Sequence, residues 1–557
     1  MTPEIVSAII SGFGHVAPEM VLGLAACIAF LGGTFRADRN LWAAFSLLAL
    51  AGAGLAMWLV RTGAADSEAA ARAAWFAGPV VADSFAQLIR VIALLGGAAL
   101  VLSSWKEIPD RQAAEYQGCL LIILAGVGLT GAANDLVTLF LALELISIPT
   151  YVLLYLPRHD NPAQEAAMKY FLLSVFSSAL VLLGFSFLYG LAGTTNLPAL
   201  ADALGVTGAG RISGVAIAAL VLVIAGLGFR ITAVPFHFYA PDVYQGTATA
   251  GAALLAFVPK VAGFAALLRL LSLVPHVVSF HDAAAGKDVT IPLDNGASLL
   301  GLQVSTLLWI IAAATMTLGN VLALLQDNLK RLLAYSSVAH AGYMLVALAA
   351  APYLRIKQEA LFGGVESLLF YLAGYGAMTI GAFAVLSYLD SPERPVTNVD
   401  DLAGLAKSHP GIALLMLVFL FSLIGIPLTA GFAGKFFIFL GAVSVYINAQ
   451  DTAQFINASE PQGWVQQGQL FLVLALVGML NSAIGAWYYL RIAAVMYLRT
   501  PLKPLDAKRN WPGLAALSAC ALVTLGLGIY GLPFVRFTQQ AVPQSTVASP
   551  IENVAQK

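Results

Sequence analysis

Charged residues are scarce in this sequence, and their scarcity excludes most soluble folds. Only 10% of the 557 residues are charged, whereas 60% are apolar, and an ordinary soluble domain has roughly 25% charged residues. The formal net charge of -1 provides no concentrated basic face of the kind that binds nucleic acid. The composition therefore predicts an integral membrane protein that binds lipid, with no large soluble domain.

Cysteine is nearly absent, and no two cysteines are spaced as a metal site requires. Cys27, Cys119 and Cys520 each stand alone in an apolar stretch, so iron–sulfur and structural zinc sites are not supported. We expect three buried free thiols and no metal site. The first twenty residues contain no lysine or arginine, so we also expect no cleaved signal peptide.

Long hydrophobic runs fill most of the chain. A transmembrane helix needs about 20 apolar residues, and runs bounded by charges, prolines and polar turns give fourteen candidate spans. They lie near 18–35, 41–60, 82–102, 116–133, 136–156, 163–191, 213–239, 247–273, 298–325, 331–350, 366–389, 411–447, 468–498 and 512–537. The predicted fold is an all-α polytopic membrane protein, and the longer loops at 275–297 and 448–467 are too short to be domains.

The lysines and arginines outside the spans predict an orientation. Loops on one side hold thirteen of them and loops on the other side hold nine. Because cytoplasmic loops are enriched in Lys and Arg, we expect both termini on the non-cytoplasmic side of the cell inner membrane.

Six basic residues lie within the predicted spans instead: Arg90, Lys169, Arg230, Lys260, Lys435 and Arg491. A charge at the bilayer centre costs roughly 2.5–3.5 kcal/mol even on insertion scales, so such residues usually face protein or water and mark ion or proton pathways. Arg90 and Arg491 lie nearer the ends of their spans, and we expect them to snorkel to the interface.

Glu144 and His340 are also singled out by their depth in the spans, and Lys169 and Lys260 by their neighbours. Glu144 lies about eight residues, or ~12 Å, into its span, and Lys169 is its expected partner, with snorkelling as the alternative for Lys169. Lys260 follows Pro259 near the middle of a span, where snorkelling is difficult, and we expect it to carry protons. His340 lies mid-span, where a satisfied structural histidine and a relay group are equally good interpretations. Lys330 and Arg331, at the start of that span, are expected to be interfacial anchors.

Two spans are expected to be broken within the membrane. The stretch from Leu227 to Gly246 contains Arg230 and Pro235, and the long run 411–447 contains Gly425, Pro427 and Lys435. Transporters built from inverted repeats place their sites where discontinuous helices meet. His237 and Asp242 follow the first break and are expected to line its mouth, or else to have a structural role in the loop.

The two breaks lie five spans apart, which suggests two inverted five-helix repeats. The expected division is 1–115 for spans 1–3, 116–273 for the first repeat (spans 4–8), 298–498 for the second repeat (spans 9–13), and 499–557 for span 14 and a polar tail. Each repeat has its broken helix in fourth place.

Five sequence blocks resemble a known family. FRITAVPFHFYAPDVYQG, FVPKVAGFAALLRLL, NLKRLLAYSSVAHAGYML, LAGYGAMTIGAF and GIPLTAGFAGKF are similar, in this order, to blocks of the antiporter-like membrane subunits of respiratory complex I. The PDVYQG form and a lysine at position 435 resemble subunit N more than subunit M, and the chain lacks the long amphipathic extension of subunit L.

The resemblance implies a proton-translocating subunit of an NADH:quinone oxidoreductase, driven by quinone reduction in other subunits. It implies a line of titratable groups along the membrane midplane: Glu144 with Lys169 and the position of Arg230, then Lys260, then Lys435, with His340 near the connection. The chain itself would hold no redox centre; quinone, FMN and iron–sulfur clusters would belong to partner subunits. The expected partners are other antiporter-like subunits and small membrane subunits of complex I.

One residue departs from the family pattern. The family usually has lysine at the position of Arg230, and a guanidinium is effectively never deprotonated in proteins. Either protons pass around Arg230, which then acts as a fixed charge beside Glu144, or the unit does not pump by the usual route. Arg230 therefore keeps a non-pumping structural spacer open as an alternative. A cation/proton antiporter or membrane-hydrogenase subunit of the same superfamily is the other alternative, because it would differ mainly in its partners.

Overall fold

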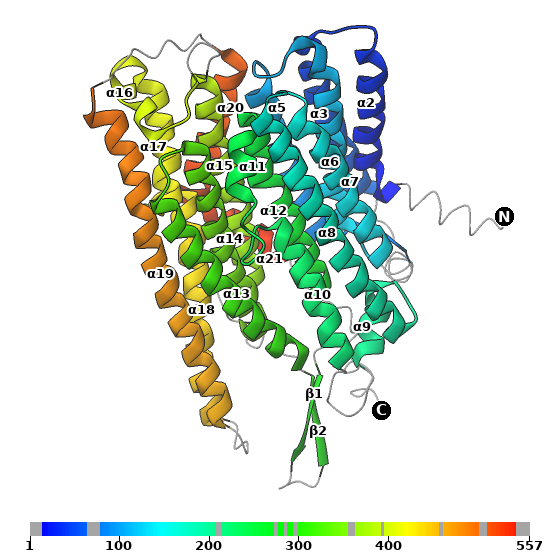
Figure 1. Cartoon of the computed structure of the whole chain (residues 1–557). Coiled ribbons are helices and arrows are strands. Elements are labelled where there is room, and N and C mark those ends of the chain that lie inside the picture. The colour runs from blue at the N-terminus through cyan, green and yellow to red at the C-terminus, as the bar shows by residue number, and fades with distance from the viewer. Residues whose placement is uncertain are drawn as a thin grey trace, which may run out of the picture.

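The computed structural model describes residues 14–63, 78–205, 214–271, 277–282, 287–292, 299–354, 363–390, 395–455, 461–500 and 510–541. Within these residues, 12 helices are long and apolar enough to cross a membrane, and three shorter apolar helices accompany them. The helices run roughly parallel and antiparallel to one another in a bundle (Figure 1). The prediction of an all-α polytopic membrane protein is confirmed.

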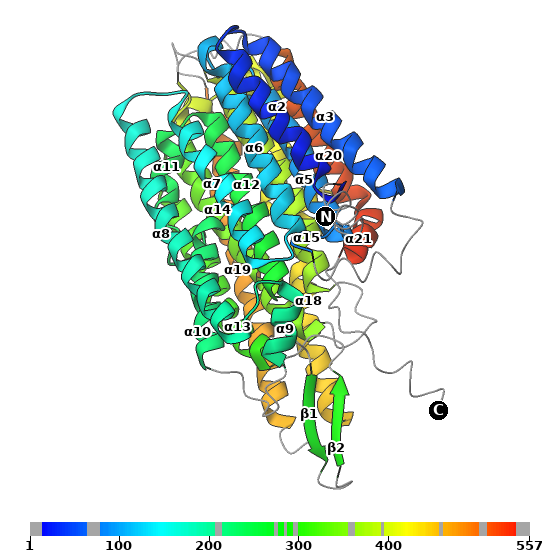
Figure 2. The ribbon, with the colours of Figure 1, turned by 90° about the vertical axis from the view of Figure 1, so that its right-hand side faces the viewer.

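The N-terminal helices form one edge of the bundle. They are α2 (Ala17–Gly33), α3 (Arg39–Gly63) and α5 (Ser84–Ser104), followed by the short 3-10 turn η2 (Asp110–Gln112). Figure 2 looks at this edge and shows α2 and α3 in front, with the C-terminal helices α20 (Trp511–Ile529) and α21 (Gly531–Gln540) beside them. Span 14 was predicted as one helix over 512–537, but the helix ends at Ile529 and a short second helix follows.

The next helices correspond to predicted spans 4–8. They are α6 (Ala113–Ala132), α7 (Leu136–Tyr155), α8 (Asn161–Ala192), the short α9 (Leu197–Gly205), α10 (Gly214–Arg230), α11 (Ala240–Gly246) and α12 (Thr249–Leu271). Span 7 was predicted to continue to residue 239, but α10 ends at Arg230 and turns separate it from α11. The predicted first break is confirmed, and Arg230 is the last residue before it.

A small hairpin separates this group from the next. Strands β1 (Val277–Asp282) and β2 (Lys287–Pro292) pair antiparallel, with Ser279 opposite Thr290, and project from the lower end of the bundle in Figure 1. The described residues of the loop around 275–297 thus form this hairpin.

The remaining helices correspond to predicted spans 9–13. They are α13 (Leu299–Leu324), α14 (Leu329–Leu354), α15 (Gly364–Leu389), the short η3 (Val399–Leu402) and α16 (Leu405–Ser408), α17 (Pro410–Ile424), α18 (Ala430–Phe455) and α19 (Pro461–Leu498). The interval between Ile424 and Ala430 is the predicted second break. The loop predicted at 448–467 is mostly helical, because α18 and α19 extend into it.

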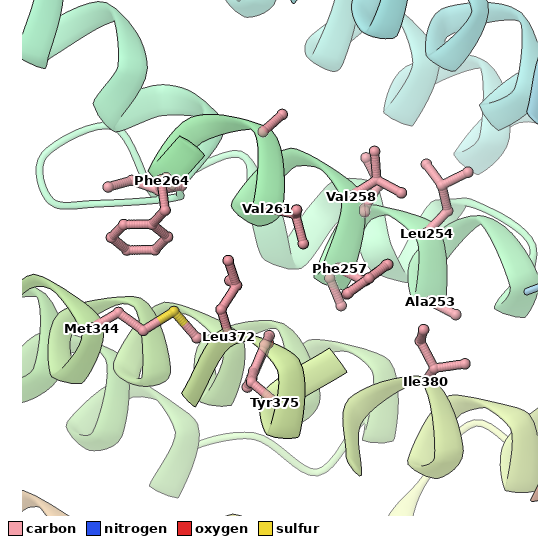
Figure 3. Packing of buried hydrophobic residues seen from close by; sticks show 14 of the residues in the cluster. Ala253, Leu254, Phe257, Val258, Val261, Phe264, Met344, Leu372, Tyr375 and Ile380 are labelled. Carbon is pink, nitrogen blue, oxygen red and sulfur yellow. The ribbon is translucent and has the colours of Figure 1, made fainter. Parts of the chain in front are cut away.

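Helix α12 is the centre of the bundle. Every residue from 249 to 270 is buried. Figure 3 shows its side chains Phe257, Val261 and Phe264 facing α14 and α15, from which Met344 and Tyr375 project. A helix that is apolar on all sides belongs in the interior, and Lys260 is therefore carried into the middle of the protein.

Small residues allow the closest helix approach. A Cβ atom on Gly319 of α13 would lie 2.6 Å from the backbone nitrogen of Ala339, and one on Gly342 of α14 would lie 2.5 Å from that of Met316. Membrane helices often use glycine in this way to bring their backbones together. This contact holds α14, and with it His340, firmly against α13.

Candidate functional site

Arg230 and Glu144 form the first part of the site. Arg230 Nη2 lies 3.2 Å from Glu144 Oε1, and Nη1 donates to the carbonyl of Leu143 at 3.1 Å and to Ser147 Oγ at 2.7 Å. Ser178 Oγ donates to the same carboxylate oxygen. The Arg230 side chain is 4% exposed and that of Glu144 is 23% exposed. A fixed positive charge therefore faces the half-buried carboxylate from the end of α10.

Lys169 is not the partner of Glu144, contrary to the sequence-based expectation. Its Nζ lies 2.6 Å from Glu165 Oε1 and 2.7 Å from Asp242 Oδ2. Asp242 Oδ1 in turn accepts a bond of 2.6 Å from Arg331 Nη1. Lys169 is 39% exposed, so it lies in a more open ion cluster at the start of α11. The position of Asp242 fits its expected place beside the first break.

Lys260 lies between the two groups of helices. Its Nζ donates to Thr232 Oγ1 at 3.0 Å and to Ser337 Oγ at 2.6 Å, and the residue is 0% exposed. Tyr375 OH also donates to Ser337 Oγ, at 2.8 Å. The ammonium thus bridges the turn after α10 and the middle of α14 through neutral hydroxyl groups.

His340 is buried among tyrosines. Its Nδ1 lies 2.5 Å from Tyr371 OH and its Nε2 lies 3.1 Å from Tyr489 OH. Tyr489 OH also bonds Ser336 Oγ. Both ring nitrogens therefore have hydroxyl partners that can donate or accept, an arrangement that suits both structural satisfaction and proton exchange.

Lys435 lies against the end of the broken helix. Its Nζ donates to the carbonyl oxygens of Leu423 at 2.9 Å and Ile424 at 3.0 Å, the last two residues of α17. The last carbonyls of a helix have no intrahelical partner and form its negative end. The break predicted from Gly425 and Pro427 thus supplies the acceptors for the lysine.

Two tyrosine rings connect these groups. Lys260 Nζ lies 5.9 Å from the ring centroid of Tyr375, whose centroid is 5.3 Å from that of His340. The His340 ring lies 5.6 Å from Tyr343, and Lys435 Nζ lies 4.8 Å from the Tyr343 centroid. A continuous series of polar and aromatic contacts therefore runs from Lys260 to Lys435.

Thr232, Ser337 and the tyrosines were not predicted from the sequence as parts of the site. Tyr371 and Tyr375 are spaced i, i+4 on α15, and this spacing places both rings on the same helix face. It is a signal in the sequence that could have indicated them. The two serines before His340 are visible in the sequence, but nothing in the sequence shows which of them meets Lys260.

Arg90 does not snorkel, contrary to expectation. It is 4% exposed, and its Nε and Nη2 bond the two carboxylate oxygens of Glu19 at 2.7 and 3.0 Å. This bidentate pair joins α5 to α2, away from the Lys260–Lys435 line. Arg491 fits its expected place near the interface, where it pairs with the exposed Asp327.

Lys330 is also more buried than an interfacial anchor would be. It is 8% exposed, and its Nζ donates to the carbonyl of Thr247 at 2.9 Å. Its neighbour Arg331 remains at the bundle end and pairs with Asp242.

No metal site is present in the part of the chain that the structure describes, where no three His, Cys, Asp or Glu residues are grouped to hold an ion. Cys119 and Cys520 are buried free thiols as expected, whereas Cys27 is exposed on α2.

The sequence matches a known family over its central part. The model for the transmembrane region of NADH:quinone oxidoreductase and Mrp antiporter subunits matches residues 133–283 and 296–458. The NADH-quinone oxidoreductase subunit N of Trichlorobacter lovleyi is 37% identical over 95% of this chain and 96% of its own length. Subunit N 1 of Solibacter usitatus is 38% identical over 82% of this chain and 83% of its own length.

Solved structures agree. A chain of respiratory complex I from Thermus thermophilus is 30% identical, with a TM-score of 0.66 over 93% of this chain and 98% of that one. A chain of the Mrp complex from Dietzia is 19% identical with a TM-score of 0.73, covering 96% of this chain and 97% of its own length, a likeness of fold alone. The chain therefore belongs to the family of NADH-quinone oxidoreductase subunit N.

Proposed function

We propose that this chain is a proton-translocating membrane subunit of an NADH:quinone oxidoreductase. In this proposal Glu144, Lys169, Lys260, His340 and Lys435 relay its protons, and Arg230 is a fixed charge beside Glu144. The observation that carries the proposal is the series of contacts from Lys260 through Tyr375, His340 and Tyr343 to Lys435. Three groups that can gain or lose a proton are aligned in the bundle interior, where charge is costly.

The partners of the two lysines favour proton exchange. Among the described residues, Lys260 has hydroxyl partners and Lys435 has carbonyl partners, and neither has an ion pair. A carboxylate partner would hold a lysine in its charged form, whereas neutral acceptors leave it able to give up its proton. This differs from Arg90 and Arg269, which are paired with Glu19 and Asp83 and suit a structural role.

Arg230 acts as a fixed charge in this proposal. A guanidinium does not release its proton, so protons pass around it, and it forms an ion pair with Glu144. Lys169 pairs with Asp242, which follows the break in the chain, whereas Arg230 precedes the break. Arg230 therefore replaces the titratable lysine of the family with an electrostatic anchor.

The two helix groups α6–α12 and α13–α19 are proposed to be the two inverted repeats, divided as the sequence predicts. Each has its broken helix in fourth place, and an odd number of spans requires opposite orientation in the membrane. The basic Arg36, Lys106 and Arg158 lie in loops at one end of the bundle, which supports a cytoplasmic location for that end and a non-cytoplasmic one for both termini, in the cell inner membrane.

The proposed partners are other membrane subunits of complex I, because the relatives are named as its subunits. In this assembly, quinone, FMN and iron–sulfur clusters belong to partner subunits, and this chain contributes proton movement.

The experiment compares Lys260→Met and Lys435→Met in the assembled complex. Inverted membrane vesicles are given NADH and a quinone, and protons moved per electron are measured together with turnover. We expect both variants to lower proton movement severalfold. Lys407→Met is the matched control, because Lys407 is exposed on α16, and it should behave as the unaltered protein.

The competing functions give different results. An unchanged proton-to-electron ratio in both lysine variants would support a structural spacer. Purification with antiporter subunits alone, together with sodium-dependent pH changes in vesicles, would support a cation/proton antiporter.

A further inference from the structure

The two broken helices end with similar backbone turns, which share one type of closing hydrogen bond but have different residues in the left-handed region. After α10, Ala233 N donates to Gly228 O at 2.8 Å and Thr232 N donates to Phe229 O at 3.0 Å. After α17, Ile426 N donates to Phe421 O at 3.0 Å. In each case a residue in the left-handed region ends the helix, which is the C-terminal cap that usually contains glycine.

The second break has the expected glycine and the first does not. Gly425 has φ 95°, whereas Thr232 has φ 59°. A β-branched residue in this region is a conformational outlier, and such outliers persist where surrounding structure holds them and the residue has a use. Thr232 thus occupies a position at which glycine would be less strained.

The hydroxyl of Thr232 explains its presence. Thr232 is 2% exposed, and its Oγ1 accepts from Lys260 Nζ at 3.0 Å while donating to Ile231 O at 2.6 Å. Glycine would remove one of the two hydroxyl partners of Lys260 and leave Ser337 as the other. Because Thr232 lies two residues after Arg230, its hydroxyl also links the Arg230 end of the site to Lys260.

We propose that Thr232 is a positioning residue for proton transfer, whose hydroxyl holds the Lys260 ammonium between the first broken helix and Ser337 of α14. This inference rests on the proposed function, because it assigns Thr232 a role in the relay through Lys260. Without the hydroxyl, the ammonium moves toward Ser337 and loses its connection to the Arg230 side.

The test compares Thr232→Ser, Thr232→Gly and Thr232→Val in the assembled complex. Each variant is measured for protons moved per electron, for the pH profile of coupled turnover, and for thermal stability of the purified complex. Serine keeps the hydroxyl, glycine removes both hydroxyl and strain, and valine removes the hydroxyl but keeps the branched shape. A hydrogen bond to a charged group is strong enough that its loss should lower coupled turnover by about tenfold.

We expect the serine variant to remain close to the unaltered protein, and the glycine and valine variants to lose proton movement and shift the pH profile. The glycine variant should keep or raise thermal stability, so its loss of pumping cannot be attributed to misfolding. A fully active glycine variant would overturn the proposal and leave Thr232 as a packing residue.

Lys260→Met is measured in parallel. If it pumps normally, the proposed relay fails, and the role of Thr232 fails with it. If it loses pumping while the glycine variant retains it, the inference about Thr232 alone is wrong.

Discussion

Arg230 and Glu144 form an ion pair in which the guanidinium is buried and the carboxylate is half-buried. Arg230 is 4% exposed and Glu144 is 23% exposed, and their closest nitrogen and oxygen lie 3.2 Å apart. The same guanidinium also bonds Leu143 O and Ser147 Oγ. One side chain therefore pairs with the Glu144 carboxylate and also holds the segment of α7 that carries it.

Two replacements of Arg230 distinguish the effect of its charge from the effect of its hydrogen bonds. Arg230→Met leaves the half-buried Glu144 without its cation, and a charge that is partly removed from water and unpaired destabilises the protein. We expect reduced assembly and strongly reduced coupled turnover. Arg230→Lys keeps the charge and should preserve most of the activity. Both are measured as NADH-driven proton uptake by vesicles; full activity in the methionine variant would remove Arg230 from the mechanism.

His340 can be tested with a substitution that keeps hydrogen bonding but cannot carry a proton. His340→Gln retains a donor and an acceptor for Tyr371 and Tyr489, the two hydroxyl partners of the imidazole. If His340 is a relay group, the glutamine variant should assemble normally and move severalfold fewer protons per electron. Normal pumping would identify His340 as a satisfied structural histidine. His340→Leu, which leaves both hydroxyls without this partner, should also be less thermally stable.

The second break depends on Gly425. Alanine at its φ of 95° is strained by roughly 1–2 kcal/mol, and the new Cβ would lie 3.3 Å from Cδ of Lys435. We expect Gly425→Ala to lower thermal stability by this amount and to slow coupled turnover. Gly411→Ala is the matched control on the same helix, because its Cβ would meet nothing within 4 Å. Equal behaviour of the two variants would contradict this explanation.

Asp242 pairs with both Lys169 and Arg331. We expect its loss to affect coupled turnover more than thermal stability. Lys169 and Asp242 are 39% and 38% exposed, and exposed ion pairs typically contribute about 0.2–1 kcal/mol. We therefore expect Asp242→Asn to assemble with nearly unchanged thermal stability but to lower coupled turnover, because Lys169 keeps Glu165 as its only carboxylate partner. Glu165→Gln is the control, and it should have a smaller effect. Equal effects would show that the position of Lys169 does not depend on Asp242.

The fold could be predicted from the sequence because membrane helices depend mainly on local hydrophobicity. Long apolar runs gave the spans, and prolines and glycines gave the two breaks, since both residue types act on the backbone where they stand. Lys260 and Lys435 were found by the same reasoning, as charges in apolar surroundings.

The partners of these charges could not be predicted, because they come from distant helices. Glu19 lies 71 residues from Arg90, and Asp242 lies 73 residues from Lys169. The only local clue was Glu165, one helical turn before Lys169, a spacing that favours an ion pair. Thr232 was not predicted because its role depends on a left-handed φ, and a threonine in the sequence gives no indication of that backbone conformation.

Glu107 is a half-buried carboxylate outside the proposed relay. It accepts from the backbone nitrogens of Thr249 at 2.5 Å and Ala250 at 3.0 Å, and from Ser387 Oγ at 2.9 Å. It therefore caps the start of α12 and joins it to α15. Burial raises the pKa of the Glu107 carboxyl, and the charge of Lys330, the Ser387 hydroxyl and the two amides offset part of this rise.

A raised pKa predicts how stability should vary with pH. The folded protein keeps the Glu107 proton to a higher pH than the unfolded chain does, so this group increasingly weakens the folded state as pH rises through the raised pKa. The glutamine in Glu107→Gln is neutral at every pH, so the variant does not lose stability in this way as pH rises. We expect the melting temperatures of the two purified complexes to be similar in acidic buffer. As pH rises, the melting temperature of the variant should increase relative to that of the unaltered protein. A constant difference, or a gain by the unaltered protein, would instead mean that Lys330 and the hydrogen-bond donors stabilise the charged carboxylate.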